Sequence, residues 1–179
     1  MFLFGFNFKA LIILLLTIVA NKPYLVFGLD ANEDQLKAVY LFNFAKYTIW
    51  PSDSFATPNA PIMFCVLSAD GIASELQKVR GRLVNNRRIE VAIASEIVPQ
   101  KCHLVYLAEG TNSLQMELSK NLAISALVVS ESHDTGSINF VRNGSKLGFL
   151  VDLVRARKAG LNFSSELLKI AIQVNNDSN

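Results

Sequence analysis

Apolar residues between positions 33 and 51 recur at helical spacing and predict one long helix. One apolar stripe contains Leu36, Val39, Tyr40, Asn43 and Tyr47, and a second contains Leu41, Phe44, Ala45 and Thr48. Glu33 and Asp34 complement the helix dipole in the first turn, and Pro51 ends the run. Two adjacent apolar stripes favour a helix that is packed into a core on more than one side.

The same helix is rich in aromatic residues, which allows a second interpretation. Tyr, Trp and Phe are enriched in surfaces that bind protein partners. The candidates for such contacts are Tyr40, Phe44, Tyr47 and Trp50. Core and interface therefore remain alternatives for this segment.

Downstream, short apolar runs alternate with helical segments. Strands are expected at residues 62–67, 88–94, 104–107 and 126–130, and helices at 72–79 and 113–122. Asn85-Asn86 is expected to form a turn before the second strand. Alternation of strand and helix is typical of a largely parallel sheet with helices on its faces.

The pattern changes near the C-terminus. Two strands, 137–142 and 146–152, are joined through Asn143-Gly144, the strongest hairpin signal in the chain. Asp152 can cap a helix at 153–158, and Ser164 can cap a last helix that runs to about Val174. We therefore expect a single α/β domain over residues 29–174, with a mostly parallel sheet flanked by helices and a closing antiparallel hairpin. Residues 175–179 are expected to form a disordered tail.

Residues 1–28 have the pattern of a secretory signal peptide. Lys9 precedes an apolar run from residue 10 to residue 20, and Asn21, Lys22 and Pro23 interrupt this run. The mature chain is then expected to begin near Leu29. An uncleaved N-terminal anchor is the alternative, although a membrane span needs about 20 apolar residues.

The charge balance changes once this segment is set aside. The full chain of 179 residues has 17 basic and 15 acidic residues. Lys9 and Lys22 lie in the predicted signal peptide, which contains no acidic residue, so 15 basic residues face 15 acidic ones in the remainder. A neutral domain offers no support for binding to nucleic acid.

The chain has two cysteines, Cys65 and Cys102, and both follow the predicted signal peptide. In an oxidising compartment they are candidates for one disulfide, while two free thiols remain the alternative. Cys102-His103 supplies adjacent ligand types without a second pair at suitable spacing, so no metal site is predicted.

Motifs that would indicate an enzyme or a cofactor are missing from the sequence. There is no phosphate-binding GxxxxGK[ST] loop, no GxGxxG after a strand, no HExxH and no GxSxG. We therefore predict a protein that is not an enzyme and that carries no cofactor.

Several segments, in order and spacing, resemble the YfiR family of exported bacterial regulators. They are Lys37-Ala38, Tyr40-Leu41, residues 43–47, Trp50-Pro51, residues 65–67, Gly81 with Val84 and Arg87, residues 102–106, residues 138–140, Ala156, Gly160-Leu161, Ser164-Ser165 and Leu167-Leu168. The pattern departs from the family at Gly136 and at residues 150–152 in the closing hairpin.

The resemblance implies a periplasmic protein that binds the sensor domain of an inner-membrane diguanylate cyclase and represses it, which lowers cyclic di-GMP and biofilm formation. It further implies a homodimer and release through an OmpA-like outer-membrane lipoprotein. Candidate contacts with the partner, besides the four aromatics, are Leu150, Asp152, Arg155 and Arg157 in the hairpin and the helix after it.

A periplasmic domain that binds a small molecule, without a cyclase partner, is the alternative function. Doubly wound sheets bind ligands beyond the carboxyl ends of their strands. The loops after Leu67, Leu107 and Ser130 would then surround the pocket.

Overall fold

The predicted long helix is α2, which spans Glu33–Tyr47. In this computed structural model its inner face is formed by the second of the two stripes: Leu41, Phe44 and Ala45 are fully buried. The first stripe is more exposed, with Leu36 at 37% and Val39 at 49% of their surface accessible. Asn43 donates a hydrogen bond from Nδ2 to the Val39 carbonyl within the helix, at 3.0 Å.

The structure describes residues 33–67, 70–94, 102–111, 125–132 and 135–176. The predicted signal peptide, the predicted helix at 113–122 and the last three residues of the chain lie outside these ranges. No helix within them is long and apolar enough to cross a membrane.

Eight strands form one mixed sheet in the order β10-β8-β7-β6-β5-β2-β4-β3. The central strands are parallel: β2 (Ile62–Leu67), β4 (Arg87–Ala94), β5 (Leu104–Leu107), β6 (Leu127–Ser130) and β7 (Ile138–Asn143). The antiparallel partners are β3 (Leu83–Val84) on β4 and β8 (Lys146–Asp152) on β7. The predicted α/β class, the parallel centre and the closing hairpin are confirmed.

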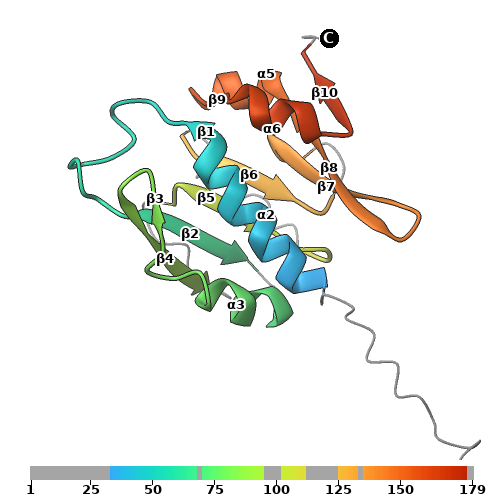
Figure 1. Ribbon diagram of the computed structural model, residues 1–179, viewed down its shortest axis with the longest axis horizontal. Coiled ribbons are helices and arrows are strands. Elements are labelled where there is room, and N and C mark those ends of the chain that lie inside the picture. The colour runs from blue at the N-terminus through green and yellow to red at the C-terminus, as the bar shows by residue number, and fades with distance from the viewer. Residues whose placement is uncertain (1–32, 68–69, 95–101, 112–124, 133–134, 177–179) are drawn as a thin grey trace, which may run out of the picture. The chain divides into compact units, whose positions relative to one another are not determined.

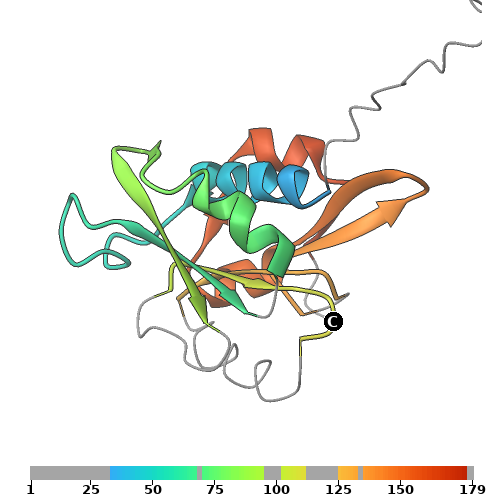
Figure 2. The same ribbon diagram turned by 90° about the horizontal axis from the view of Figure 1, so that it is seen from below.

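Three of the described helices lie on one face of this sheet. Figure 2 shows α2, α3 (Asp70–Gln77) and α6 (Ser165–Ile170) on the same side. The core on this side contains Phe64, Tyr106, Phe140 and Phe149 beneath Phe44. Alternate strand residues face the other side, where Leu67, Val105, Leu107 and Val128 cluster around Cys65 and Cys102.

The closing hairpin is tighter than predicted. Asn143 pairs with Lys146, so the two loop residues are Gly144 and Ser145, one position later than the expected Asn143-Gly144 turn. Gly144 has φ +62°, a conformation that glycine adopts without strain. Figure 1 shows the hairpin of β7 and β8 extending beyond the sheet on the side where α2 begins.

The last helix, which was predicted to run to about Val174, ends earlier than predicted. α6 ends at Ile170, and Gln173–Asn175 form β10, an edge strand that runs parallel to β8. The amide of Ile172 donates to the Phe149 carbonyl at 3.0 Å, which draws the chain out of the helix. Gly148 makes room for this crossing, because a Cβ atom there would lie 2.3 Å from Cδ1 of Ile172. Asn175, which the sequence placed in the tail, belongs to this strand.

A second, two-stranded sheet was not predicted. β1 (Thr48–Ile49) continues directly from α2 and pairs antiparallel with β9 (Asn162–Phe163), which follows α5 (Leu153–Lys158). The amide of Ser164 donates to the Tyr47 carbonyl at 2.9 Å and extends this pairing. The small sheet thus fixes the end of α2 to the segment after α5.

Candidate functional site

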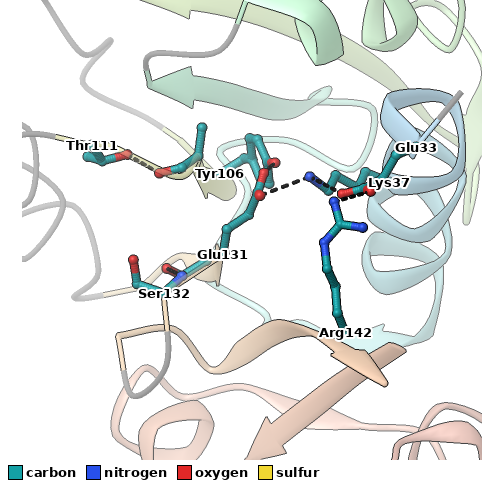
Figure 3. A network of polar contacts seen from close by, with 9 residues as sticks. Glu33, Lys37, Tyr106, Thr111, Glu131, Ser132 and Arg142 are labelled. Atoms are coloured by element: carbon teal, nitrogen blue, oxygen red, sulfur yellow. Dashed lines mark hydrogen bonds and ion pairs between the residues drawn. The ribbon is translucent and has the colours of Figure 1, made fainter. Parts of the chain in front are cut away.

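A charged network surrounds the first turns of α2. The ammonium of Lys37 lies 2.8 Å from Glu33 of the same helix and 2.8 Å from Glu131 of the loop after β6. Arg142 of β7 pairs with the other carboxylate oxygen of Glu33, and the Tyr106 hydroxyl donates to Glu131. Figure 3 shows Lys37 between the two carboxylates, with Arg142 approaching Glu33 from the hairpin. Two separate elements, the loop after β6 and strand β7, are therefore joined to α2 by ion pairs.

The network favours the charged forms of Lys37 and Glu33 and the protonated form of the Tyr106 hydroxyl. Burial would lower the pKa of Lys37, but its hydrogen bonds to Glu131 and Glu33 outweigh burial and raise the pKa above 10.5. The hydrogen bond from Lys37 is the main cause that lowers the pKa of Glu33 below 4.5. Burial first, and the carboxylate of Glu131 second, raise the pKa of the Tyr106 hydroxyl, which stays protonated.

Beside this network lies a hollow of about 370 Å³, here called the Lys37 hollow. Its lining residues are Glu33, Lys37, Glu109, Glu131, Phe140, Val141, Arg142 and Leu147. Glu109 and Glu131 follow the carboxyl ends of β5 and β6. Three loops were expected to surround a ligand pocket. The hollow lies beside two of them, those after Leu107 and Ser130.

The other end of α2 is held by stacked rings. Phe55, in the loop after Pro51, stacks on His103 with ring centroids 4.5 Å apart, and the guanidinium carbon of Arg87 lies 3.7 Å from the Phe55 centroid. Trp50 meets Phe55 and His103 edge-on at 6.0 and 6.1 Å. Arg87 also donates to the carbonyls of Thr57 and Ala60 at 2.9 and 2.8 Å, which anchors the loop.

His103 acts as a structural link in this stack. Its Nδ1 accepts the Met63 amide N–H at 3.0 Å, so Nε2 carries the proton and donates to the Ser54 carbonyl, also at 3.0 Å. The neighbouring Cys102 is bonded to Cys65, with Cα atoms 5.7 Å apart. The predicted disulfide is confirmed. His103 links the loop after Pro51 to β2, the strand that contains Cys65.

A second hollow, of about 400 Å³, opens beside these rings and is called the Trp50 hollow. Its lining residues are Lys46, Tyr47, Thr48, Ile49, Trp50, Pro51, Ser52, Phe55, Asn85, Arg87 and Ser164. Tyr47 and Trp50 are both half-buried here, and Ile49 has 56% of its surface exposed. Two of the four predicted aromatic contacts thus meet at one accessible site.

The other two aromatics have a mainly structural place. Phe44 is fully buried and has no surface to offer a partner, because it packs under Tyr40, Phe140 and Phe149. Tyr40 is half-buried, and its ring meets Phe149 edge-on at 5.6 Å. Its hydroxyl donates to the Leu147 carbonyl at 3.5 Å.

The predicted contacts after the hairpin surround the start of α5. Asp152 caps this helix, with Oδ1 accepting the Arg155 amide at 2.8 Å, and its other oxygen lies 3.3 Å from the Arg155 side chain. Arg157 is exposed and donates to Asn176 at 2.7 Å. Leu150 is half-buried on β8.

The small sheet brings the two predicted contact regions near each other. β1 lines the Trp50 hollow, and its partner β9 follows α5 within four residues. Gly160, which ends α5 at φ +74°, lies against Pro51, since a Cβ atom there would be 3.1 Å from the proline ring. Residues some 110 positions apart in sequence therefore share one region of the surface.

The charged network was not predicted from the sequence, and local patterns could have indicated only part of it. The Glu33–Lys37 pair has the i, i+4 spacing of a helix ion pair and could have been noticed. Glu131, Tyr106 and Arg142 lie in three other segments, and no local pattern connects them to α2. Among the described residues, no group of side chains suits a metal ion.

Comparison with known proteins agrees with the motifs. None of the curated proteins matches the chain significantly. The YfiR/HmsC-like family matches residues 34–172, from the first turn of α2 to the residue before β10. The match covers most of the chain and nearly all of the described structure, and the protein therefore belongs to the YfiR/HmsC-like family.

Proposed function

We propose that this protein is a periplasmic regulator that binds the sensor domain of an inner-membrane diguanylate cyclase and represses it, so that cyclic di-GMP and biofilm formation fall. The observation that carries this proposal is family membership over residues 34–172. The disulfide between Cys65 and Cys102 supports it, because such bonds persist in oxidising compartments such as the periplasm.

We place the contact with the cyclase on the surface around the small sheet of β1 and β9. On one side are Tyr47, Ile49 and Trp50, which offer exposed apolar and aromatic surface. On the other are Arg155 and Arg157, whose exposed guanidinium groups suit carboxylates of a partner. Asp152 caps α5 next to Arg155, and Leu150 precedes it on β8. Tyr40 and Phe44 pack against Phe149 of β8, so we propose no direct contact for Phe44 and a peripheral one for Tyr40.

Repression of this kind works by population shift. A regulator that binds only the inactive sensor moves the equilibrium toward it by its difference in affinity for the two states. Moving the sensor from 1:99 to 99:1 takes about 5.5 kcal/mol. This protein would then need no chemistry of its own, in agreement with the lack of catalytic motifs.

The test is a deletion strain that expresses the cognate cyclase. Loss of the protein should raise cyclic di-GMP, and the wild-type gene should restore the lower concentration. The double variant Ile49→Glu with Arg155→Glu should fail to restore it, while the exposed control Arg82→Glu succeeds. Unchanged cyclic di-GMP after deletion would contradict repression.

We also propose that the regulator is a homodimer and that an OmpA-like outer-membrane lipoprotein releases it from the cyclase. Light scattering of the purified protein measures the first claim, and a monomer at micromolar concentration contradicts it. Competition between purified lipoprotein and sensor domain for the immobilised regulator measures the second. Unchanged sensor binding at saturating lipoprotein contradicts release.

A second candidate function is the binding of a small molecule. The Lys37 hollow favours it, because it lies beyond the carboxyl ends of β5 and β6, where open α/β sheets bind their ligands. Its volume of about 370 Å³ is within the usual range for such sites. Thermal shift against a panel of periplasmic metabolites tests this function, and no stabilisation by any of them argues against it.

A further inference from the structure

In the Lys37 hollow, each oxygen of two carboxylates has a partner, whereas two cations retain donors without one among the described residues. Glu33 uses one oxygen for Lys37 and the other for Arg142, and Glu131 uses its two for Tyr106 and Lys37. An ammonium has three N–H donors and a guanidinium five. Within the described residues, Lys37 has two acceptors and Arg142 one, so both retain donors at the hollow.

The third carboxylate of the hollow, Glu109, differs from Glu33 and Glu131 in its partners. Glu109 is exposed, lies two residues beyond β5 and has no ion pair or hydrogen bond among the described residues. With Glu33 and Glu131 balanced by Lys37 and Arg142, Glu109 leaves the hollow one negative charge in excess. The hollow thus offers spare donors at one place and a spare acceptor at another.

The strand order separates these two places. Glu109 follows β5, Arg142 lies in β7, and β6 runs between them. Neighbouring strands are about 4.8 Å apart, so the two backbones are separated by about 10 Å. Phe140, Val141 and Leu147 add apolar surface to the hollow.

We propose that the Lys37 hollow binds a short zwitterionic peptide, with its terminal carboxylate on Arg142 and Lys37 and its terminal ammonium on Glu109. This inference rests on the second candidate function and names its ligand class. A dipeptide to tripeptide spans about 7 to 10 Å when extended, which is of the same order as the separation of the two backbones.

Ligands with a single charge fit this arrangement less well. A simple carboxylate satisfies the donors of Lys37 and Arg142 but is repelled by Glu109, and a simple amine pairs with Glu109 but meets the Arg142 guanidinium. A single amino acid carries both charges closer together than a dipeptide does, so we expect it to contact the two ends less well. A zwitterionic peptide meets both ends and brings no net charge to the hollow.

Calorimetric titration of the exported protein with glycyl-leucine tests the proposal. Blocking either end should weaken binding at least tenfold, so N-acetyl-glycyl-leucine and glycyl-leucinamide serve as the two probes. L-leucine should also bind more weakly than the dipeptide. Equal affinity for the free and the blocked dipeptides, or no binding of glycyl-leucine, would overturn the inference.

Two exposed variants identify which end each side chain holds. Glu109→Gln should weaken glycyl-leucine about tenfold and abolish the preference for a free amino end, while the preference for a free carboxylate remains. Arg142→Gln should do the reverse. Arg82→Gln, an exposed arginine outside the hollow, is the matched control and should bind as wild type does. Variants that leave both preferences unchanged would contradict the assignment.

The outcomes separate this inference from the functions it accompanies. If the metabolite panel yields a ligand whose binding Glu109→Gln and Arg142→Gln weaken while glycyl-leucine does not bind, the hollow remains a site and the ligand class is wrong. If nothing binds but deletion still raises cyclic di-GMP, the regulator stands and the ligand site falls.

Discussion

The two ends of α2 are held in place by different physical means. At the first turns, Lys37 pairs with Glu33 and Glu131, and Arg142 adds a contact from the hairpin. At the last turn and beyond, Phe55 stacks on His103 and Arg87 while Trp50 meets these rings edge-on. One end depends on charge and the other on ring packing.

This difference predicts that the stability of the two ends responds differently to salt and pH. Interactions between partly exposed charges weaken as salt rises, whereas burial of rings does not depend on screening. The charged end would therefore be the part of the fold that senses pH and ions, while the stacked end keeps its geometry. Such a division suits a protein that presents a fixed contact surface at one end and receives a small molecule at the other.

Removal of the central cation should have the largest effect. Lys37→Met leaves Glu131 and Glu33 without their shared partner in a mostly buried place, and loss of one partner from a buried pair costs about 3 kcal/mol or more. Urea unfolding measures the change in free energy.

Lys46→Met provides the control on the same helix. Lys46 is exposed, and its ammonium lies 5.2 Å from the Tyr47 ring centroid, so the loss should be about 0.5 kcal/mol or less. Equal losses for the two lysine variants would mean that the charged network is not what holds the first turns.

Truncation of the stacked ring at the other end should have an intermediate effect. Phe55→Ala removes a half-buried ring and its contacts with His103 and Arg87, which should lower the free energy of unfolding by about 2 kcal/mol. The loss should change little between low and high salt, because ring burial supplies most of it. Leu83→Ala, at a side chain that is 60% exposed, should change stability by about 0.5 kcal/mol or less.

A strong salt dependence of the Phe55→Ala effect would show that both ends rely on charge, and the comparison would fail.

The smallest effect is expected for Glu33→Gln, which removes two partly exposed ion pairs and should cost about 0.5 to 1 kcal/mol at neutral pH. The pH dependence is more informative. Because folding lowers the pKa of Glu33 below 4.5, its stabilisation is present above pH 4.5 and is lost as the pH falls through the folded value.

Folding raises the pKa of Lys37 above 10.5, so its contribution is present below pH 10.5 and is lost as the pH rises through the folded value. Thermal unfolding across the pH range should show both limits in the wild type. Glu33→Gln should flatten the acid limit and leave the Phe55→Ala difference unchanged. An acid limit of the same steepness in Glu33→Gln would assign the effect to other carboxylates.

Local signals predicted much of this fold because they act over few residues. The continuous apolar run at Ile62–Leu67 is β2 with the predicted bounds, and Asn85 and Asn86 form the predicted turn with φ of 48° and 65°. Asp152 and Ser164 cap the helices that their side chains suggested. Each of these features depends on residues within a few positions of one another.

Features that depend on distant partners were missed. β10 forms because Ile172 reaches Phe149 over Gly148, although the period-two spacing of Ile170, Ile172 and Val174 is a strand signal that helix capping obscured. β1 and β9 are each two residues long, too short to show a pattern. The buried Lys37 was missed because Glu131, which helps to neutralise it, is 94 positions away in the chain.

The Cys65–Cys102 bond stabilises the fold only after the two cysteines have been oxidised. It closes a segment of 37 residues, which contributes about 4 kcal/mol by restricting the unfolded chain. If the chain is exported as we propose, it lacks this contribution in the reducing cytosol and is easier to keep unfolded for passage through the membrane. Oxidation on the far side then makes the folded state hard to reverse, so the protein becomes most stable only in the compartment where we propose that it acts.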